Sequence, residues 1–167
     1  MNIDPMELAS KTCYAIAYAL SNVPGVTLAI TAFPGETIFR SNKQQIGDTV
    51  FPILKPKELL HQKFAMNSNG GTPMAPAIWY ALTQLHLQNQ FRKIIFIITD
   101  GEPDSREATK QDMKAAQNQG VEVYGLGINT ESMLDLLPGN SAIIPDITHL
   151  PNTLFSLLQK TLLKANG

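Results

Sequence analysis

The chain has 167 residues and a mass of 18.3 kDa, the length of one ordinary domain that can bury roughly 70% of its unfolded surface around a single core. Hydrophobic residues make up 44% and charged residues 16%, below the typical ~25%, which favours a compact α/β protein over a disordered chain. With 13 Lys and Arg against 14 Asp and Glu, the net charge is −1, so the composition argues against a nucleic-acid partner.

A single cysteine and the hydropathy pattern indicate the expected environment. Cys13 has no second cysteine with which to form an internal disulfide or a two-cysteine metal site, which favours a reducing compartment. No segment approaches the roughly 18 consecutive apolar residues of a membrane span, and the first residues lack a signal-peptide pattern. We therefore expect a cytoplasmic protein without membrane contact, folded as a single domain over residues 1–167.

The first 54 residues predict a helix followed by a pair of strands. Asp4-Pro5-Met6-Glu7 combines an N-cap, a first-turn proline and a capping-box glutamate, so a helix should begin at residue 5. Cys13 lies on the apolar stripe of that helix, which predicts a core thiol rather than a catalytic one. The β-rich segments Val26–Phe33 and Thr49–Leu54 predict an antiparallel pair, and Pro52 places the second strand at a sheet edge.

The rest of the chain alternates helical and strand patterns. In order, these predict helices over Lys57–Ala65 and Pro73–Asn89, a strand over Ile94–Ile98, a helix over Ser105–Gln119, a strand over Val121–Ile128, a short helix near Met133, a weak strand over Ala142–Ile144 and a helix over Asn152–Lys164. This alternation predicts an α/β fold with a doubly wound, mostly parallel sheet and helices on both of its faces.

The loop Thr99–Ser105 follows the most apolar predicted strand and contains the carboxylates of Asp100, Glu102 and Asp104. Ligands of doubly wound sheets gather beyond the carboxyl ends of the strands, and carboxylate oxygens suit Mg²⁺ or another hard cation. A structural interpretation is also open, in which Asp104 or Ser105 caps the next helix and Glu102 is solvated. Asp100, at the tip of an apolar strand, is expected to be partly desolvated and to need a cation or several hydrogen bonds.

A second loop, Asn67–Pro73, immediately precedes a predicted helix. Thr72 can be the N-cap of that helix, with Pro73 as the first helical residue, and Gly70 and Gly71 allow close approach of the backbone. Anion binding at the helix N-terminus is a further interpretation of the same residues. The pattern of this loop, taken alone, does not decide among these roles.

A glycine-preceded Thr on one loop and an Asp closing an apolar strand as ITDG on another, in this α/β order, resemble the von Willebrand factor A domain. The segments GGTPMAPAIWYAL, RKIIFIITDGEPD and GVEVYGLGI are also similar to the C-terminal A domain of CobT-type cobaltochelatase subunits. The resemblance implies a divalent cation, Mg²⁺ or Mn²⁺, with Thr72 and Asp100 among its ligands. Glu102 and Asp104 are further candidate ligands.

One part of that resemblance is missing. The family carries an Asp-x-Ser-x-Ser motif on a central strand before the first helix, but only three residues precede Asp4 here, and they span at most about 11 Å. We therefore expect a weakly held or absent cation and a sheet without its usual first central strand, so that Val26–Phe33 and Ile94–Ile98 pair directly or another segment lies between them. Either the sequence is truncated at an internal Met, or a strand is borrowed from a partner or a second copy, which would form a dimer.

The resemblance implies a non-catalytic protein–protein interaction module in which an acidic side chain of the partner completes the cation's coordination. The likeness to CobT-type subunits further implies a non-ATPase subunit of a chelatase-like complex that partners an AAA+ ATPase. Two alternatives are a metal-independent sheet-edge assembly protein and a Mg²⁺-dependent phosphohydrolase or nuclease that uses the carboxylates after Thr99. Against the enzyme, the neighbouring strand ends at Gly127-Ile128-Asn129 without a carboxylate.

Overall fold

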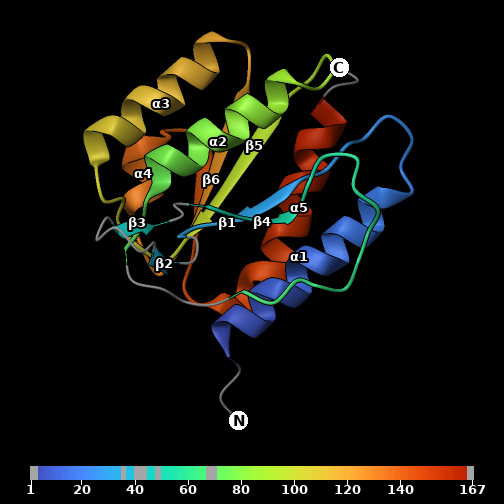
Figure 1. Cartoon of the computed structure of the whole chain (residues 1–167), viewed down its shortest axis with the longest axis horizontal. Coiled ribbons are helices and arrows are strands. Elements are labelled where there is room, and N and C mark those ends of the chain that lie inside the picture. Colours follow the sequence, from blue (N-terminus) through green and yellow to red (C-terminus); the bar gives the residue numbers. More distant parts are fainter. Residues whose placement is uncertain (1–3, 35–36, 40–44, 48–49, 67–70, 165–167) are drawn as a thin grey trace.

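The computed structural model describes residues 4–34, 37–39, 45–47, 50–66 and 71–164 (Figure 1). The helices are α1 (Pro5–Ser21), α2 (Met74–His86), α3 (Arg106–Asn118), α4 (Ser132–Leu136) and α5 (Leu150–Leu163), with a 3₁₀ turn at Ile147–His149. The strands are β1 (Ile30–Ala32), β2 (Thr37–Phe39), β3 (Gln45–Gly47), β4 (Phe51–Leu54), β5 (Ile94–Thr99), β6 (Glu122–Ile128) and β7 (Ser141–Ile144).

Among the described residues the largest sheet has three strands and is parallel, as the alternating pattern predicts, while β1–β4 and β2–β3 form two separate antiparallel pairs. Strands β5, β6 and β7 are hydrogen-bonded in that order and run parallel, with Ile94 opposite Glu122 and Gly125 opposite Ser141. Helices α2 and α3 cover one face of this sheet and α1 and α5 cover the other (Figure 1). The predicted α/β class with helices on both faces is therefore confirmed.

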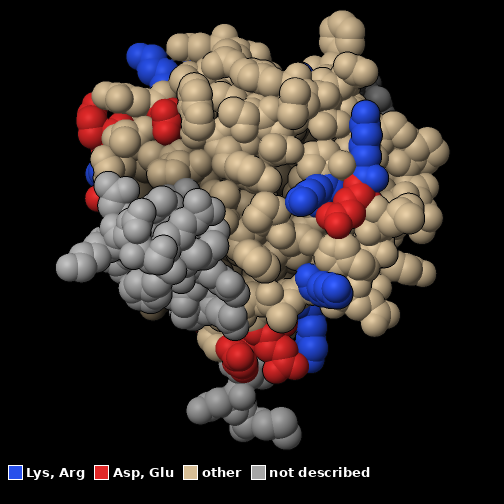
Figure 2. Space-filling view, in the orientation of Figure 1, with Lys and Arg blue, Asp and Glu red and all other residues tan. Residues whose placement is uncertain are grey.

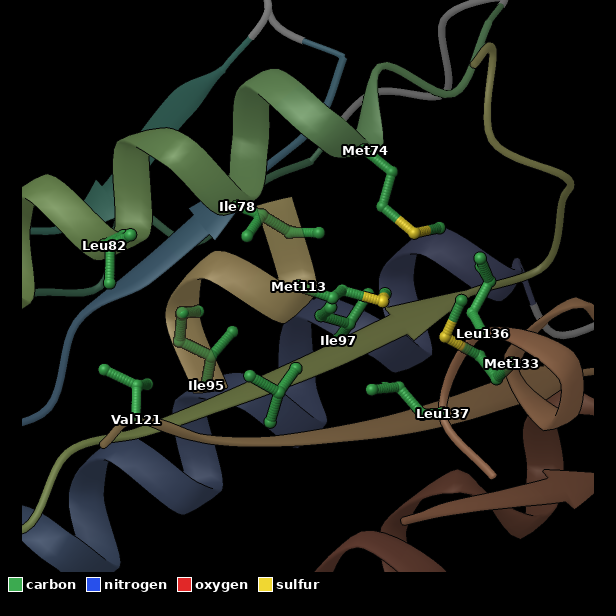
Figure 3. Packing of buried hydrophobic residues seen from close by; sticks show 12 residues of the cluster. Met74, Ile78, Leu82, Ile95, Ile97, Met113, Val121, Met133, Leu136 and Leu137 are labelled. Carbon is green, nitrogen blue, oxygen red and sulfur yellow. The ribbon is translucent and has the colours of Figure 1, made fainter. Parts of the chain in front are cut away.

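Alternate residues of β5 face the two helical layers. Ile95 and Ile97 are buried in the cluster formed by α2, α3 and α4, as Figure 3 shows. Phe96 and Ile98 pack instead against the cluster formed with α1 and α5. Both faces of the strand are thus apolar, which is why its sequence is an unbroken hydrophobic run.

Helix α1 begins where the sequence predicts. The side chain of Asp4 accepts a hydrogen bond from the Met6 N–H at 3.0 Å, which confirms the N-cap. Glu7 pairs with Lys11 at 2.6 Å, so within the described residues the reciprocal half of the predicted capping box is not formed. Cys13 packs against a buried cluster, and burial raises the pKa of its thiol to about 11, in keeping with the predicted core role.

The helix predicted over Lys57–Ala65 is wrong. This segment is irregular after a turn at Pro56 and Lys57, and Lys57 adopts a positive φ of 63° that interrupts any right-handed helix. The Glu58 carboxylate accepts a hydrogen bond from the Lys55 N–H at 2.8 Å, which closes the turn. The buried Phe64 packs edge-on against Tyr14 of α1, so the apolar spacing of this segment reflects anchors of a loop.

The antiparallel pair predicted in the first third of the chain is present but shorter. β1 covers only Ile30–Ala32 of the expected strand and pairs with β4, with an irregularity between Ile30 and Thr31. The small β2–β3 hairpin between them was not predicted. Within the described residues β1 pairs only with β4 and β5 only with β6, so the predicted option of direct pairing between β1 and β5 is wrong.

Charge is distributed in small mixed groups on the face shown in Figure 2, where Lys and Arg side chains lie near Asp and Glu. In the part of the chain that the structure describes, no helix has the length and apolar character needed to cross a membrane.

Candidate functional site

The first candidate residue stands at the carboxyl end of β5. Thr99 closes the strand and is buried, and its hydroxyl accepts a hydrogen bond from the Gly101 N–H at 3.2 Å, which turns the chain. Asp100 lies between them and is exposed. The expected partial desolvation of Asp100 is therefore wrong, because the apolar layer ends with Thr99. Among the described residues, no hydrogen bond or ion pair engages the Asp100 carboxylate.

The two candidate loops are joined by a pair of hydrogen bonds. The Thr72 N–H donates to Oδ1 of Asp104 at 2.7 Å, and the Asp104 N–H donates to the Thr72 carbonyl oxygen at 2.9 Å. The first bond has an ionised acceptor and is the stronger kind. Thr72 is thereby held beside the loop that carries Asp100, at the carboxyl end of β5, which we call the rim. Residues 67–70 of the predicted loop lie outside the described residues.

The Thr72 hydroxyl lies against the residue that follows Asp100. A Cβ placed on Gly101 would be 3.0 Å from Oγ1 of Thr72, closer than ordinary packing allows. Gly101 therefore lets the hydroxyl approach the backbone of the β5 loop. Gly71, at φ +87°, makes the sharp turn that leads into Thr72.

Thr72 does not cap α2, contrary to the structural interpretation of the sequence. The helix begins at Met74, its N-cap residue is Pro73, and no side chain caps it. The Thr72 carbonyl oxygen accepts hydrogen bonds from the N–H groups of Met74 and Asp104 at 2.8 and 2.9 Å. This backbone pairing fixes Thr72 in the contact between the loops, outside N-cap geometry.

The other predicted carboxylates have structural partners. Glu102 pairs with Arg106 at 3.0 Å, and the same guanidinium pairs with Asp135 of α4 at 2.6 Å. Ser105 caps α3 by accepting a hydrogen bond from the Ala108 N–H at 3.3 Å, as the structural interpretation predicts. Asp100 is thus the one carboxylate of this loop that the described residues leave without a partner.

Sequence reasoning missed two residues that hold the loop. Arg106 lies four residues after Glu102, a helical spacing that identifies the pair, but its bond to Asp135 joins segments 29 residues apart. The buried Ser132 hydroxyl donates to the Gly101 carbonyl oxygen at 3.1 Å and links α4 to the rim. These two contacts depend on the tertiary fold and have no local signal.

The donor set suits a hard cation only in part. Residues 4–34, 37–39, 45–47, 50–66 and 71–164 contain no group of three or more His, Cys, Asp or Glu side chains that could hold a metal ion. Thr72 offers a neutral hydroxyl oxygen and Asp100 a carboxylate, both of the type that Mg²⁺ and Mn²⁺ prefer. With two protein oxygens, most coordination positions would belong to water.

Solved structures share this fold at low sequence identity. The pilus adhesin SpaC from Lactobacillus rhamnosus GG matches with a TM-score of 0.72 at 14% identity, over 93% of this chain and 28% of that one. Proximal thread matrix protein 1 from the mussel byssus, with a zinc-occupied MIDAS motif, matches at 0.69 and 12%, over 93% and 42%. Manganese-loaded TRAP protein of Plasmodium vivax matches at 0.62 and 13%, over 86% and 62%.

The chain thus spans less than two thirds of the length of each of these proteins. No curated protein sequence matches it significantly. The sequence model of the von Willebrand factor type A domain matches residues 54–143, which is more than half of the 167 residues. This chain belongs to the von Willebrand factor type A domain family.

Proposed function

We propose that this chain is a non-catalytic protein–protein interaction module whose partner-binding rim is formed by Thr72 and Asp100. The observation that carries the proposal is the contact between the two loops, in which the Thr72 hydroxyl lies against Gly101. Gly101 directly follows Asp100, whose carboxylate has no hydrogen bond or ion pair among the described residues. The solved relatives support it, since they include an adhesin and two proteins with zinc or manganese bound.

The proposed rim binds Mg²⁺ or Mn²⁺ through the Thr72 hydroxyl and the Asp100 carboxylate. One negative charge against a divalent cation leaves a net positive site, which favours an acidic side chain of the partner as an additional ligand. Because water supplies the remaining ligands, the affinity of the chain alone should be weak, with a dissociation constant of about 10⁻³ M or higher.

The partner that best fits the sequence resemblance is an AAA+ ATPase subunit. The segments similar to CobT-type subunits include both loops of the rim, GGTPMA and TDGEPD. We infer that the chain acts in the cytoplasm as a non-ATPase subunit of a chelatase-like complex and presents the rim to an acidic residue of that ATPase. This step rests on family analogy.

The same geometry disfavours the hydrolase alternative. A metal-dependent phosphohydrolase needs several carboxylates converging on its metal ions. Here Glu102 is paired with Arg106, and Asp104 accepts the Thr72 N–H, so their oxygens are directed to structural partners. Asp100 alone is not a hydrolytic site.

The test uses Mn²⁺ alone and two-dimensional NMR of the full chain. Mn²⁺ should broaden the amide signals of Gly101 and Thr72 first, and Asp100→Asn should abolish that selectivity. Asp112→Asn removes a half-buried carboxylate from α3, and as the control variant it should keep the selective broadening. Uniform broadening, or selective broadening that survives Asp100→Asn, would disprove the site. The parent chain and the Asp112→Asn control should then bind a glutamate-containing peptide more tightly in Mn²⁺ than in EDTA.

A further inference from the structure

Asp100 and Gly101 form an aspartyl–glycyl pair directly after β5. The Asp100 side chain is exposed, and its carboxylate has no hydrogen bond or ion pair with any described residue. Gly101 has no Cβ to shield its backbone nitrogen or to restrict its rotation. An aspartyl carboxyl carbon and the backbone nitrogen of the next residue can close a five-membered succinimide ring. A free carboxylate followed by glycine is the combination that hinders this closure least.

The other aspartates in the described part of the chain lack this combination. In each of them the carboxylate has a hydrogen-bonding partner, the next nitrogen belongs to a helix, or the next residue is a proline without an N–H. They are Asp4, before Pro5; Asp104, bonded to Thr72; Asp112, within α3; Asp135, paired with Arg106; and Asp146, bonded to Thr148. Ring closure is therefore expected at Asp100 ahead of these positions.

Two hydroxyl groups hold Gly101 in place. Its N–H donates to Oγ1 of Thr99 at 3.2 Å, and its carbonyl oxygen accepts a hydrogen bond from the buried hydroxyl of Ser132 at 3.1 Å. Neither bond belongs to a helix or a strand ladder, so each can open without unfolding the sheet. Closure of the ring needs the Gly101 N–H released from Thr99 and the peptide rotated toward the Asp100 side chain. The two hydroxyls therefore slow the reaction without excluding it.

We propose that Asp100 is a modification site at which the fold permits isomerisation to isoaspartate, at a rate set by the hydroxyls of Thr99 and Ser132. In the first step the carboxylate takes up a proton from solvent, and the electron pair of the Gly101 nitrogen bonds to Cγ. A C–O bond of the carboxyl group breaks, and the hydroxyl group leaves as water with the proton of the nitrogen. The product is a succinimide that joins Asp100 and Gly101.

The second step opens the ring with water. Water adds to the main-chain carbonyl carbon of Asp100, the bond from that carbon to the Gly101 nitrogen breaks, and the new carboxyl group releases a proton. Gly101 is then attached through Cγ. Addition of water at Cγ instead restores aspartate. One water leaves and one enters, so the mass is unchanged and no oxidant or reductant takes part.

Isoaspartate changes the rim in two respects. The main chain now passes through Cβ and Cγ and is one atom longer, which moves Gly101 away from its contact with the Thr72 hydroxyl. The carboxylate is attached directly to Cα and no longer extends on a methylene group. Cation binding should therefore be lost. This consequence rests on the proposed function, whereas the isomerisation itself involves no cation.

The test follows the modification by peptide mapping. The full chain is kept at neutral pH in EDTA for several weeks and then digested with trypsin, which releases Ile94–Arg106 as one peptide that contains both Asp100 and Asp104. Electron-transfer fragmentation cleaves the additional main-chain bond of isoaspartate and so locates it. We expect isoaspartate at residue 100 and none at Asp104, the internal control, whose carboxylate is bonded to Thr72. The free peptide Ile98–Arg106 should convert faster at residue 100, because it lacks the fold.

Variants at Thr99 test the control of the rate. Thr99→Val keeps the shape of this buried side chain but removes the acceptor, and it should raise the isomerisation rate about threefold to tenfold, as expected for one hydrogen bond. Thr99→Ser retains the hydroxyl and should follow the parent. Should Thr99→Val fail to fold, Ser132→Ala releases the Gly101 carbonyl oxygen and should also raise the rate.

Absence of isoaspartate at residue 100 of the folded chain, while the free peptide converts, would overturn the proposal. Equal rates in the parent, Thr99→Val and Ser132→Ala would overturn the role of the two hydroxyls. Because the assay is run in EDTA, neither outcome depends on the proposed cation site. The isoaspartate form, separated by chromatography, should lack the selective Mn²⁺ broadening of the parent, and persistence of that broadening would overturn the consequence for the rim.

Discussion

Thr72 and Asp104 are hydrogen-bonded to each other twice, although 32 residues separate them in the chain. One bond runs from the Thr72 N–H to the Asp104 carboxylate and the other from the Asp104 N–H to the Thr72 carbonyl oxygen. The carboxylate that resembled a metal ligand in the sequence therefore positions the loop that carries the Thr72 hydroxyl. Its contribution to cation binding should be indirect.

Asp104→Ala should release the Thr72 loop while leaving both proposed ligands in the chain. We expect a loss of about 1 kcal/mol in the free energy of unfolding, since the lost bond is charge-assisted but exposed. Mn²⁺ affinity should fall severalfold, because Thr72 no longer has a fixed place relative to Asp100. Urea denaturation and NMR titration with Mn²⁺ measure the two effects, and Asp104→Asn, which keeps an acceptor oxygen, should restore most of both. Unchanged Mn²⁺ affinity in Asp104→Ala would show that the hydrogen bonds between Thr72 and Asp104 do not position the proposed site.

The Thr72 hydroxyl can be removed without disturbing the two hydrogen bonds to Asp104, because both of them use the backbone groups of Thr72. Thr72→Val keeps the side-chain shape and should leave the melting temperature within a few degrees of the parent. Mn²⁺ affinity should fall by about tenfold, the value of one lost oxygen ligand at about 1.4 kcal/mol. Thr72→Ser retains the oxygen and should bind Mn²⁺ like the parent. Equal affinity of the Val and Ser variants would remove Thr72 from the proposed ligand set.

Burial of Cys13 predicts a pH dependence of stability. Because burial raises the pKa of the thiol to about 11, the folded chain holds this proton through a range in which the unfolded chain releases it, from about pH 8.5 upward. The unfolded state therefore binds fewer protons, and stability should fall as pH rises from about 8.5 to 11, while below that range the contribution is fully present. Urea denaturation at pH 7, 9 and 10 measures the slope, which should be shallower in Cys13→Ala. Equal slopes would mean that the thiol does not titrate differently in the two states.

Elements with a strong local pattern were predictable from sequence. The apolar run at Ile94–Ile98 and the capped helix after Ser105 lie within a residue or two of β5 and α3. The segment Lys57–Ala65 failed because its apolar residues face a neighbouring helix from a loop, and a spacing pattern does not distinguish loop anchors from a helical face.

The contact between the two candidate loops was not predictable from local patterns. The strand-end rule accounts for the position of Asp100 after β5, and only the family resemblance brought Thr72 together with it. Local rules assigned Thr72 to a helix cap and Asp104 to a ligand or cap. The bond between them overrides both assignments, and a contact between residues 32 apart leaves no trace in either local pattern.

The close approach of Thr72 to Gly101 gives the sharpest test of this rim. Gly101→Ala adds a methyl group 3.0 Å from the Thr72 hydroxyl oxygen, so one of the two loops must shift. We expect a loss of about 1–2 kcal/mol in the free energy of unfolding and weaker Mn²⁺ binding. In Thr72→Ala/Gly101→Ala the second substitution should cost less than it does alone, with a coupling of about 0.5–1 kcal/mol. Urea denaturation of the four chains closes this cycle. Additive costs would mean that the two residues do not touch in solution, and the contact on which the proposed rim depends would then be lost.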